Sequence, residues 1–471
     1  MPINNLKNIF IPILLAFLCV SAFQTRLTNF KNSKARTIDE VVYVRLATQI
    51  VDGGLQQYTS IPYANELAAQ GRDLPGYFFH PLFKHPPVFS LLIALSFKLF
   101  GINENAAAYI PILFSILMIP LIFLLGRMIF NAKIGLIAAL ILTFDPINII
   151  CSQKIWMEST LSFFILLSVT FFAYAIKSKK DIFFLLSGIG CGLAALTKYP
   201  SILTTFAFIL YAMAVQRGLL KKPMFLLSLV LPIILMIPWF LFMRSSSQAS
   251  FMDSLVRIHY KTPIFNGVPI IGIIGIALLI FFLWLFVIKE KTPELKKWPI
   301  DPVRFRKKFL IVISIIFGFA LWPQFFHSWQ ITFLPYTTWR SGTFSGEPVT
   351  FYLGRLMEFG IIYIFAFLSF FLVNKEQKEL ADILRINTFV VLLFYIIWRN
   401  YQSRYILACL PFLILLGVDL LFRIYNQAGQ LDNSFFRIIT RSAVIIVGCL
   451  IFMKSQYINI NLSYTNNLCY F

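Results

Sequence analysis

The sequence predicts an all-α polytopic transmembrane protein. Of its 471 residues, 59% are hydrophobic and only 13% are charged, whereas a soluble domain carries about 25% charged residues. Apolar runs such as 224–243 and 268–288 recur along the whole chain, and each has the roughly 17 to 25 residues that a helix needs to cross a bilayer. An outer-membrane barrel would instead show short segments of alternating hydrophobicity. We therefore expect a bundle of about 13 membrane spans.

The strong positive charge of the chain is explained by membrane topology. Its 41 basic and 20 acidic residues give a net charge of +21, but most of the excess falls in alternate short loops, as the positive-inside rule requires of a chain with a cytoplasmic N-terminus. Nucleic acid is therefore not an expected partner. The outer loops then hold all four histidines and the acids best suited to chemistry. The basic segments assigned to the cytoplasmic side are 127–133, 177–180, 217–222, 289–308, 375–385 and 423–441.

The elements follow in order from the N-terminus. The first apolar run, 9–23, is interpreted as an uncleaved span and not as a signal peptide, because residues 20–22 form a weak cleavage site. It leads into a large extracytoplasmic loop, 24–105, in which the short run 89–100 predicts a helix lying in the membrane interface. The later candidate spans are 106–130, 134–150, 161–176, 182–196, 202–215, 224–243, 268–288, 309–326, 359–373, 386–398, 405–422 and 443–453.

The whole chain, 1–471, is expected to form one integral membrane domain. Within it we distinguish the first extracytoplasmic loop, 24–105, a core transmembrane module, 106–215, and a C-terminal transmembrane region, 216–471. The loop carries the main catalytic candidate, so we expect the other parts to be organised around it.

The first loop contains a helix-capping sequence. Thr37 is followed three residues later by Glu40 and then by an apolar series, which is the pattern of a capping box in which Glu40 reaches back to the backbone of Thr37. Asp39 takes no part in this cap, so its carboxylate is available for a different role. Near the end of the loop, two prolines fit the start of a second helix directly after Lys84 and His85, where the positive end of the helix dipole adds to their charge.

Two acids are the catalytic candidates. Asp39 is the candidate general base, because a carboxylate at a helix start near the membrane surface can take a proton from an acceptor hydroxyl. The alternative is that Asp39 only complements the positive end of its helix. Glu158 precedes a long apolar run at the outer boundary, a depth at which ionisable groups usually pair or function.

Five residues are candidate ligands of a phosphate on the same face. Each of the five can carry a positive charge, and a single basic side chain near the end of a span is more often a membrane anchor whose charged end reaches the interface. Several cations that converge on one face would instead stabilise the negative charge of a phosphate leaving group. The candidates are Lys84, His85, Lys154, Lys198 and Arg404.

A divalent metal ion is an open alternative at this face. His85 or His259, together with Asp39 or Glu40, could hold a cation that bridges a phosphate, which makes Glu40 either a helix cap or a metal ligand. No H-x-x-x-H or similar local spacing supports such a site. The six cysteines are not spaced as metal ligands either and are interpreted as small core residues. No other cofactor is expected.

Seven short motifs are spread along the chain: Asp39-Glu40 with Tyr43, His85-Pro86-Pro87, 95–101, 126–130, 154–158, 192–200 and Arg404-Tyr405. Together they resemble the GT-C superfamily of membrane glycosyltransferases. The most similar branches are the protein O-mannosyltransferases, the lipid A aminoarabinose transferases and the bacterial transferases that modify lipopolysaccharide. The resemblance is strong over about the first 200 residues, and beyond them only the Arg404 region and the number of spans agree.

The resemblance implies an inverting transfer of a sugar from a polyprenyl-phosphate donor to a lipid, glycan or protein acceptor on the extracytoplasmic face of the cell membrane. It matches Asp39 to the base of the family and places Glu158 in the same site. Three positions depart from the family pattern: His85 stands where the aminoarabinose branch often has Lys, Lys84 replaces an acid that can hold a metal, and Glu158 replaces a commoner Asp. A polytopic secondary transporter or a flippase for lipid-linked sugars is the alternative, although transporters tend to place their sites near the midplane of the membrane.

Overall fold

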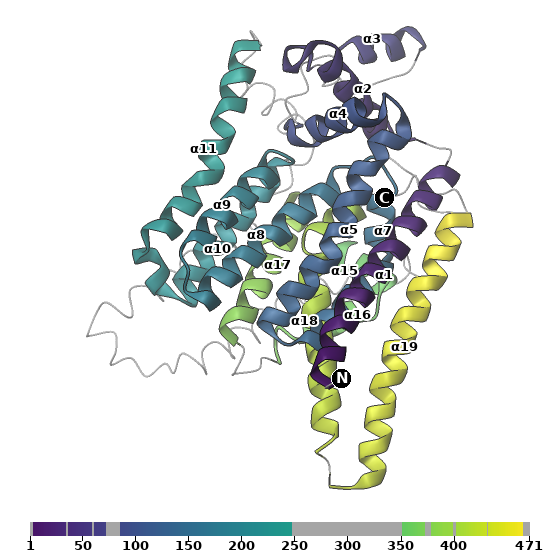
Figure 1. The fold of residues 1–471 in the computed structure, drawn as a ribbon, viewed down its shortest axis with the longest axis vertical. Coiled ribbons are helices and arrows are strands. Elements are labelled where there is room, and N and C mark those ends of the chain that lie inside the picture. The colour runs from purple at the N-terminus through teal and green to yellow at the C-terminus, as the bar shows by residue number, and fades with distance from the viewer. Residues whose placement is uncertain are drawn as a thin grey trace.

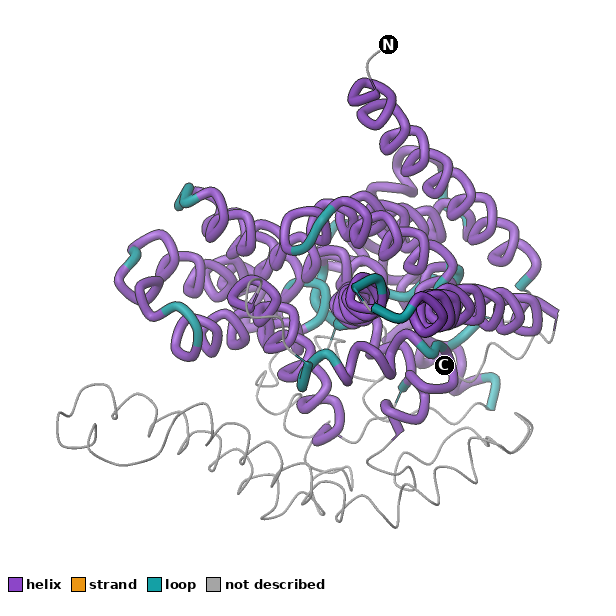
Figure 2. The backbone as a smooth tube through the Cα atoms, turned by 90° about the horizontal axis from the view of Figure 1, so that it is seen from below, coloured by secondary structure: helices purple, strands orange, loops and turns teal. Residues whose placement is uncertain are grey.

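The structure is a computed structural model in which every described element is a helix, and no strand occurs in the described part of the chain (Figure 2). Two of the predicted spans, 268–288 and 309–326, lie outside the described residues, as do the candidate ligands Lys84 and His259. The described residues are 3–33, 36–58, 61–71, 85–246, 351–372, 378–398, 402–430 and 432–464.

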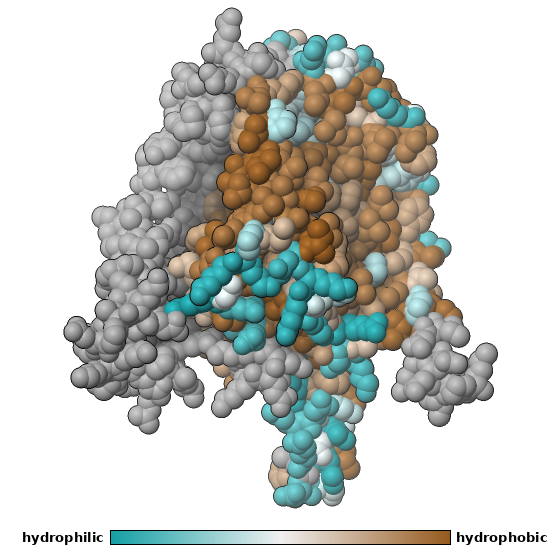
Figure 3. Space-filling view, turned by 60° about the vertical axis from the view of Figure 1, so that its left-hand side comes forward, coloured by the Kyte–Doolittle hydropathy of each residue, from teal (hydrophilic) through white to brown (hydrophobic). Residues whose placement is uncertain are grey.

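Six of the described helices are long and apolar enough to cross a membrane, or seven if one bent pair of helices is counted as a span. The protein is therefore a multi-pass membrane protein, as the apolar runs predicted. Figure 3 shows a broad hydrophobic belt on one face, with hydrophilic residues above and below it. The six helices are α1 (Ile3–Asn32), α5 (Glu104–Ile129), α8 (Glu158–Ser178), α11 (Pro223–Ser246), α18 (Leu410–Ala428) and α19 (Ser434–Tyr464).

Helix α1 is longer than the predicted first span, because it continues beyond residue 23 to Asn32. The extension contains Arg26, which is fully buried. Its guanidinium donates to the Ser115 hydroxyl at 2.8 Å and to the Thr143 carbonyl oxygen at 3.2 Å. A buried charged group is tolerated when it is hydrogen-bonded, so these bonds let the helix run on through a polar stretch. The first loop accordingly begins after Asn32 and not at residue 24.

The predicted span 134–150 is broken into α6 (Ala132–Phe144) and α7 (Pro146–Ser152), which meet at an angle of 54°. Pro146 lacks an N–H group and fits the first turn of a new helix. The Asp145 side chain caps that helix by accepting a hydrogen bond from the Asn148 N–H at 3.1 Å. The break turns the chain towards residues 153–157, which lead into α8.

Two later predicted spans are also divided. The run 359–373 contains α16 (Ile362–Leu368), which follows the separate helix α15 (Phe351–Phe359). The run 405–422 begins as a 3-10 helix, η7 (Ser403–Ala408), before α18 starts. Shorter or less apolar helices complete the bundle: α9 (Ile182–Ala195), η3 (Tyr199–Ser201), α10 (Ile202–Ala214), η4 (Arg217–Lys221) and α17 (Lys378–Trp398).

The first loop forms a group of helices at one end of the bundle: α2 (Ile38–Gly53), η1 (Leu55–Gln57), α3 (Ile61–Ala69) and α4 (Val88–Phe100) (Figure 1). Helix α4 buries Phe89, Ile93 and Phe97 and exposes leucines on its opposite face. An apolar face directed away from the protein is what a helix in the membrane interface presents to lipid. The exposed leucines are Leu91, Leu95 and Leu99.

The bundle has two chemically different ends. Helix α8 starts at Glu158 and α9 returns antiparallel beside it, so Lys198, just after α9, meets Glu158 at 2.9 Å. At the other end of α8, Lys177 donates to the Met128 carbonyl oxygen, and Lys222 pairs with Asp181 at 2.6 Å. A helix of the length of α8 separates these ends by about 30 Å.

Candidate active site

The site begins at the N-terminus of α2, where the predicted capping box is confirmed. The Thr37 hydroxyl oxygen accepts a hydrogen bond from the Glu40 N–H at 3.4 Å, and the Glu40 carboxylate accepts one from the Thr37 N–H at 2.7 Å. Glu40 is fully buried, while the side chain of Asp39 is 29% exposed. The cap therefore fixes the start of α2 and turns Asp39 out of the cap, as predicted.

The Asp39 side chain is not free, however, because it pairs with Arg404 on η7. Arg404 Nη2 donates to Asp39 Oδ2 at 2.6 Å, and Arg404 Nε lies 3.5 Å from Glu158 Oε1. One guanidinium thus joins two carboxylates that are far apart in the sequence. This is a use of its fork of N–H donors that a single ammonium group cannot reproduce.

Lys198 completes a cluster of four charges. Its ammonium group lies 2.9 Å from Glu158 Oε1 and 4.0 Å from the centre of the Tyr405 ring. The Arg404 guanidinium lies 4.7 Å from the centre of the Trp156 ring. These cation–π contacts stabilise the position of both cations without neutralising their charges. The structure therefore brings together Asp39, Glu158, Lys198 and Arg404, which come from four separate segments.

The electrostatics of the cluster keep Arg404 positively charged. Burial alone would lower the pKa of its guanidinium, but the carboxylates of Glu158 and Asp39 raise that pKa well above the usual range. Tyr43, one turn after Asp39 on α2, has its pKa raised by burial and by the same two carboxylates. The Tyr43 phenol is therefore neutral beside the charged cluster.

His85 lies against α2, on the side of the helix that carries Tyr43. The Tyr43 hydroxyl is 3.3 Å from His85 Nδ1, and the two rings meet edge to face with centres 5.2 Å apart. The Tyr58 hydroxyl donates to the His85 carbonyl oxygen at 2.9 Å. His85 thus contacts Tyr43, which follows Asp39 by one helical turn on α2.

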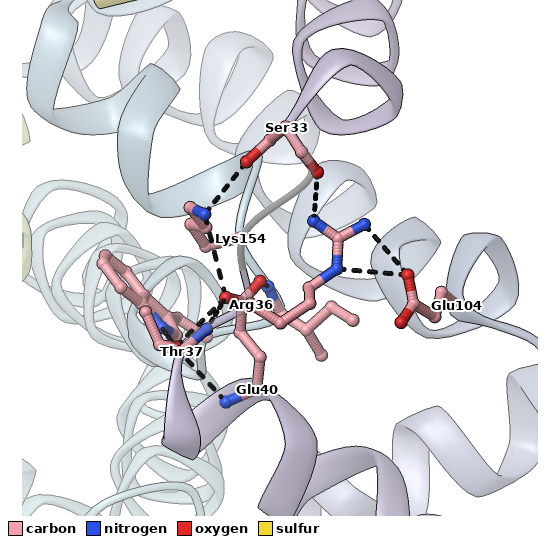
Figure 4. Close-up of polar contacts among 8 residues, drawn as sticks. Ser33, Arg36, Thr37, Glu40, Glu104 and Lys154 are labelled. Atoms are coloured by element: carbon pink, nitrogen blue, oxygen red, sulfur yellow. Dashed lines mark hydrogen bonds and ion pairs between the residues drawn. The ribbon is translucent and has the colours of Figure 1, made fainter. Parts of the chain in front are cut away.

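Lys154 lies elsewhere, behind the start of α2. Its side chain has no exposed surface, and its ammonium group bonds to the Ser33 hydroxyl at 3.0 Å and lies 3.8 Å from Glu40 Oε2 (Figure 4). The next two residues join the same group, because the Ile155 N–H donates to Glu40 Oε1 at 3.1 Å and Trp156 Nε1 donates to the Thr37 hydroxyl at 3.0 Å.

A divalent metal ion was one alternative at this face, and the described residues do not gather a set of ligands for it. Among them, no group of three or more His, Cys, Asp or Glu side chains is placed to hold a metal. Glu40 is fully buried, and its two oxygens accept from the Thr37 and Ile155 backbones beside the Lys154 ammonium, so it does not face the cluster as a ligand would. His259 lies outside the described residues, and a metal site that includes it stays an open alternative.

Sequence reasoning missed the aromatic residues that support the cluster. Trp156 and Tyr405 were noted only as parts of motifs, and Tyr43 only as a neighbour of the acids. A signal was present, since an aromatic residue stands beside Arg404 and another two positions before Glu158. Its meaning depends on the tertiary fold, because both rings lie under a guanidinium or ammonium group from another segment.

Two solved structures have the same fold over nearly the whole of this chain. ArnT from Cupriavidus metallidurans, bound to undecaprenyl phosphate, matches 98% of this chain and 77% of its own length, with a TM-score of 0.59 and 13% identity. The archaeal oligosaccharyltransferase AglB from Archaeoglobus fulgidus, in complex with an inhibitory peptide and a dolichol-phosphate, matches 97% of this chain and 56% of its own, with a TM-score of 0.56 and 14% identity. The chain has the GT-C fold.

Sequence comparison finds two further similarities, each over part of the chain. The model of the dolichyl-phosphate-mannose-protein mannosyltransferase family matches residues 84–242. An uncharacterized protein from Aquifex aeolicus (strain VF5) is 27% identical over 222 residues, which make up 45% of this chain and 44% of that protein. The chain thus matches less than half the length of this curated relative.

Proposed function

We propose that this protein is an inverting glycosyltransferase that moves a sugar from a polyprenyl-phosphate donor to a lipid, glycan or protein acceptor. The observation that carries the proposal is the cluster of Asp39, Glu158, Lys198 and Arg404 at one end of a membrane-spanning bundle. A lipid-linked donor has its tail in the bilayer and its phosphate at the interface, at the depth where these charges gather.

The cations of the cluster are the proposed ligands of the donor phosphate. Arg404 and Lys198 are each bound to a carboxylate and supported by an aromatic ring, so they are oriented before a donor arrives. Positive groups placed in advance stabilise the charge that develops on a leaving phosphate. ArnT and AglB, which share the fold, were solved with undecaprenyl phosphate and dolichol-phosphate respectively. His85, which contacts Tyr43, and Lys84, which lies outside the described residues, are proposed as further donor contacts.

Asp39 is the proposed general base. Its side chain is 29% exposed and that of Glu158 only 4%, so an acceptor can reach Asp39 more easily. The acceptor oxygen attacks the anomeric carbon as the bond to the phosphate oxygen breaks, its proton passes to Asp39, and the polyprenyl phosphate leaves with the bonding electrons. Glu158 holds both cations in position. One base is sufficient, whereas a retaining enzyme uses a second carboxylate as nucleophile.

The reaction is proposed to take place on the extracytoplasmic face. Helix α1 ends beside the site, where Ser33 contacts Lys154, so the N-terminus of α1 lies at the opposite end of the bundle. Lys177, Lys180 and Lys222 lie at that opposite end too. Basic residues in short loops remain on the cytoplasmic side, which leaves the charged cluster facing outward.

The proposal is tested by incubating the purified protein in lipid vesicles with a panel of radiolabelled polyprenyl-phosphate sugars and an extract of envelope acceptors. We expect release of free polyprenyl phosphate for at least one sugar. Asp39→Asn should lower the rate at least about 100-fold, which is a typical contribution of general base catalysis. The variant should remain folded, because Asp39 takes no part in the cap. Movement of intact donor across the vesicle membrane without cleavage would indicate a flippase, and full activity of Asp39→Asn would remove Asp39 as the base.

A further inference from the structure

We propose that Glu40 and Lys154 are positioning residues, and that Lys154 is not a ligand of the donor phosphate. This inference rests on the proposed function, since the group that they position is the proposed base. The buried pair joins three segments of chain and so fixes the distance between Asp39 on one side and Arg404 and Glu158 on the other.

The pair lies within a set of polar contacts that joins three segments (Figure 4). Lys154 binds Ser33 at the end of α1, and lies 3.8 Å from Glu40 on the first turn of α2. Glu40 in turn accepts from the Ile155 N–H at 3.1 Å. The end of α1, the start of α2 and the turn before α8 are thus connected through two side chains.

The burial of both side chains makes the connection specific. The side chains of Glu40 and Lys154 are 1% and 0% exposed. Neither charge can turn to water if the other is removed, and an uncompensated buried charge is strongly unfavourable. The position of the turn relative to α2 is therefore determined by a geometry in which the two charges remain together.

The connection reaches the cluster along two short paths. On one side, Asp39 directly precedes Glu40 on the capped turn of α2. On the other side, the Trp156 indole donates to the Thr37 hydroxyl and lies under the Arg404 guanidinium, and Glu158 follows two residues later. A shift of the turn against α2 would separate Asp39 from Arg404, whose atoms are 2.6 Å apart.

The surroundings of Lys154 differ from those of a ligand-binding cation. Lys198 has a side chain that is 19% exposed and faces the cluster over the Tyr405 ring. Lys154 has no exposed surface, and its ammonium group contacts Ser33 and Glu40. A phosphate could bind Lys154 only after the three segments had separated.

The test compares two roles for Lys154 by separate measurements of binding and turnover. Lys154→Met removes the positive charge and leaves the buried Glu40 carboxylate unpaired, which can prevent folding. The double variant Glu40→Gln/Lys154→Met removes both charges and so avoids an unpaired buried charge. Lys154→Arg keeps the charge as the conservative variant. The affinity for undecaprenyl phosphate, the kcat and KM for a polyprenyl-phosphate sugar, and the labelling of Asp39 by a carbodiimide are measured for each.

We expect the double variant to bind undecaprenyl phosphate within about twofold of the wild type, because Lys198 and Arg404 are retained. Its kcat should fall about 100-fold, the cost of a small misplacement of a reacting group, with KM little changed. Carbodiimide labelling of Asp39 should rise severalfold as Asp39 separates from Arg404. Lys154→Arg, which keeps the positive charge, should have a kcat between those of the double variant and the wild type.

The matched control is Glu66→Gln. Glu66 on α3 pairs with Arg45 at 3.4 Å in the same loop, but its side chain is 49% exposed, so removing its charge should leave all three measurements unchanged. A tenfold or larger loss of undecaprenyl phosphate affinity in Lys154→Met or in the double variant would overturn the inference and make Lys154 a phosphate ligand. Unchanged kcat and labelling in the double variant would overturn it too. If the wild type bound and cleaved no polyprenyl phosphate compound, the proposed function would fail, whereas the labelling of Asp39 would still decide whether the pair positions it.

Discussion

Arg404 shows how much of the site depends on the shape of one side chain. Its guanidinium reaches Asp39 and Glu158 together and rests on the Trp156 ring. Lys198 contacts Glu158 at a single atom. The two cations have the same charge but different roles. Among the described residues, only Arg404 contacts both Asp39, the proposed base, and Glu158.

The substitutions Arg404→Lys and Lys198→Arg should therefore have unequal effects. A lysine at 404 reaches only one of the two carboxylates, and the loss of a hydrogen bond between charged groups costs about 1.5 to 3 kcal/mol. We expect Arg404→Lys to lower kcat/KM for the donor about 10-fold to 100-fold and Lys198→Arg to lower it by less. Steady-state kinetics with one polyprenyl-phosphate sugar would check this. Equal losses in the two variants would show that charge alone matters at position 404.

The sequence predicted which residues belong to the cluster only because it predicted their depth in the membrane. Glu158, Lys198 and Arg404 stand at the ends of apolar runs, so their placement at one surface followed from the topology. Lys154 has the same sequence signature, but the structure buries it against Ser33 and Glu40. That difference arises from contacts between segments more than 100 residues apart, which local patterns do not contain.

At the scale of elements, the prediction was accurate where hydrophobicity decides and incomplete where polar contacts decide. Helices α5, α8 and α11 match apolar runs closely. The bend between α6 and α7 had a local signal in Pro146, although the run was read as one span. The extension of α1 had no such signal, because Arg26 is accommodated by hydrogen bonds to Ser115 and Thr143 on other helices.

Helices α5 and α6 approach each other closely at Gly135, which has no side chain. A Cβ atom on Gly135 of α6 would lie 2.6 Å from the Phe123 carbonyl oxygen of α5, whereas one on Gly448 of α19 would meet nothing within 4 Å. Gly135→Ala must therefore push α5 and α6 apart, at a cost of about 1 to 3 kcal/mol. Gly448→Ala should be neutral or slightly stabilising, because alanine favours a helix.

Thermal unfolding of both glycine variants in detergent would measure this difference. A clear decrease in Tm is expected for Gly135→Ala, and no decrease for Gly448→Ala. Since α6 leads through α7 to the turn that carries Trp156, activity should fall with the first substitution as well. Equal Tm values for Gly135→Ala and the wild type would contradict the close approach of α5 and α6.

At the scale of the whole molecule, the two ends of the bundle differ in their charged residues. The end with α2, α3 and α4 holds the cluster of two carboxylates and two cations (Figure 1). The other end holds turns with an excess of basic residues, where Lys177 and Lys180 lie and Lys222 pairs with Asp181. The sequence predicted this difference, because short loops between apolar runs can be assigned to alternate sides. It did not predict how the outer segments meet each other.

The orientation of the bundle can be tested with single cysteines. In a variant whose six native cysteines are replaced by alanine, Gln56→Cys places a thiol on exposed η1 and Lys180→Cys places one on the exposed turn after α8. The two positions lie at opposite ends of a bundle about 30 Å long.

If the cluster faces outward, a membrane-impermeant maleimide added to intact cells should label the cysteine at position 56. It should label the cysteine at position 180 only after the membrane is opened. The reverse pattern would place the cluster in the cytoplasm, where donor and acceptor would have to be presented from the inner leaflet. Labelling of both positions in intact cells would instead mean that the reagent had entered, so a cytoplasmic protein is followed as the control. Because η1 belongs to the loop that carries Asp39, the accessible end identifies the compartment from which the acceptor comes.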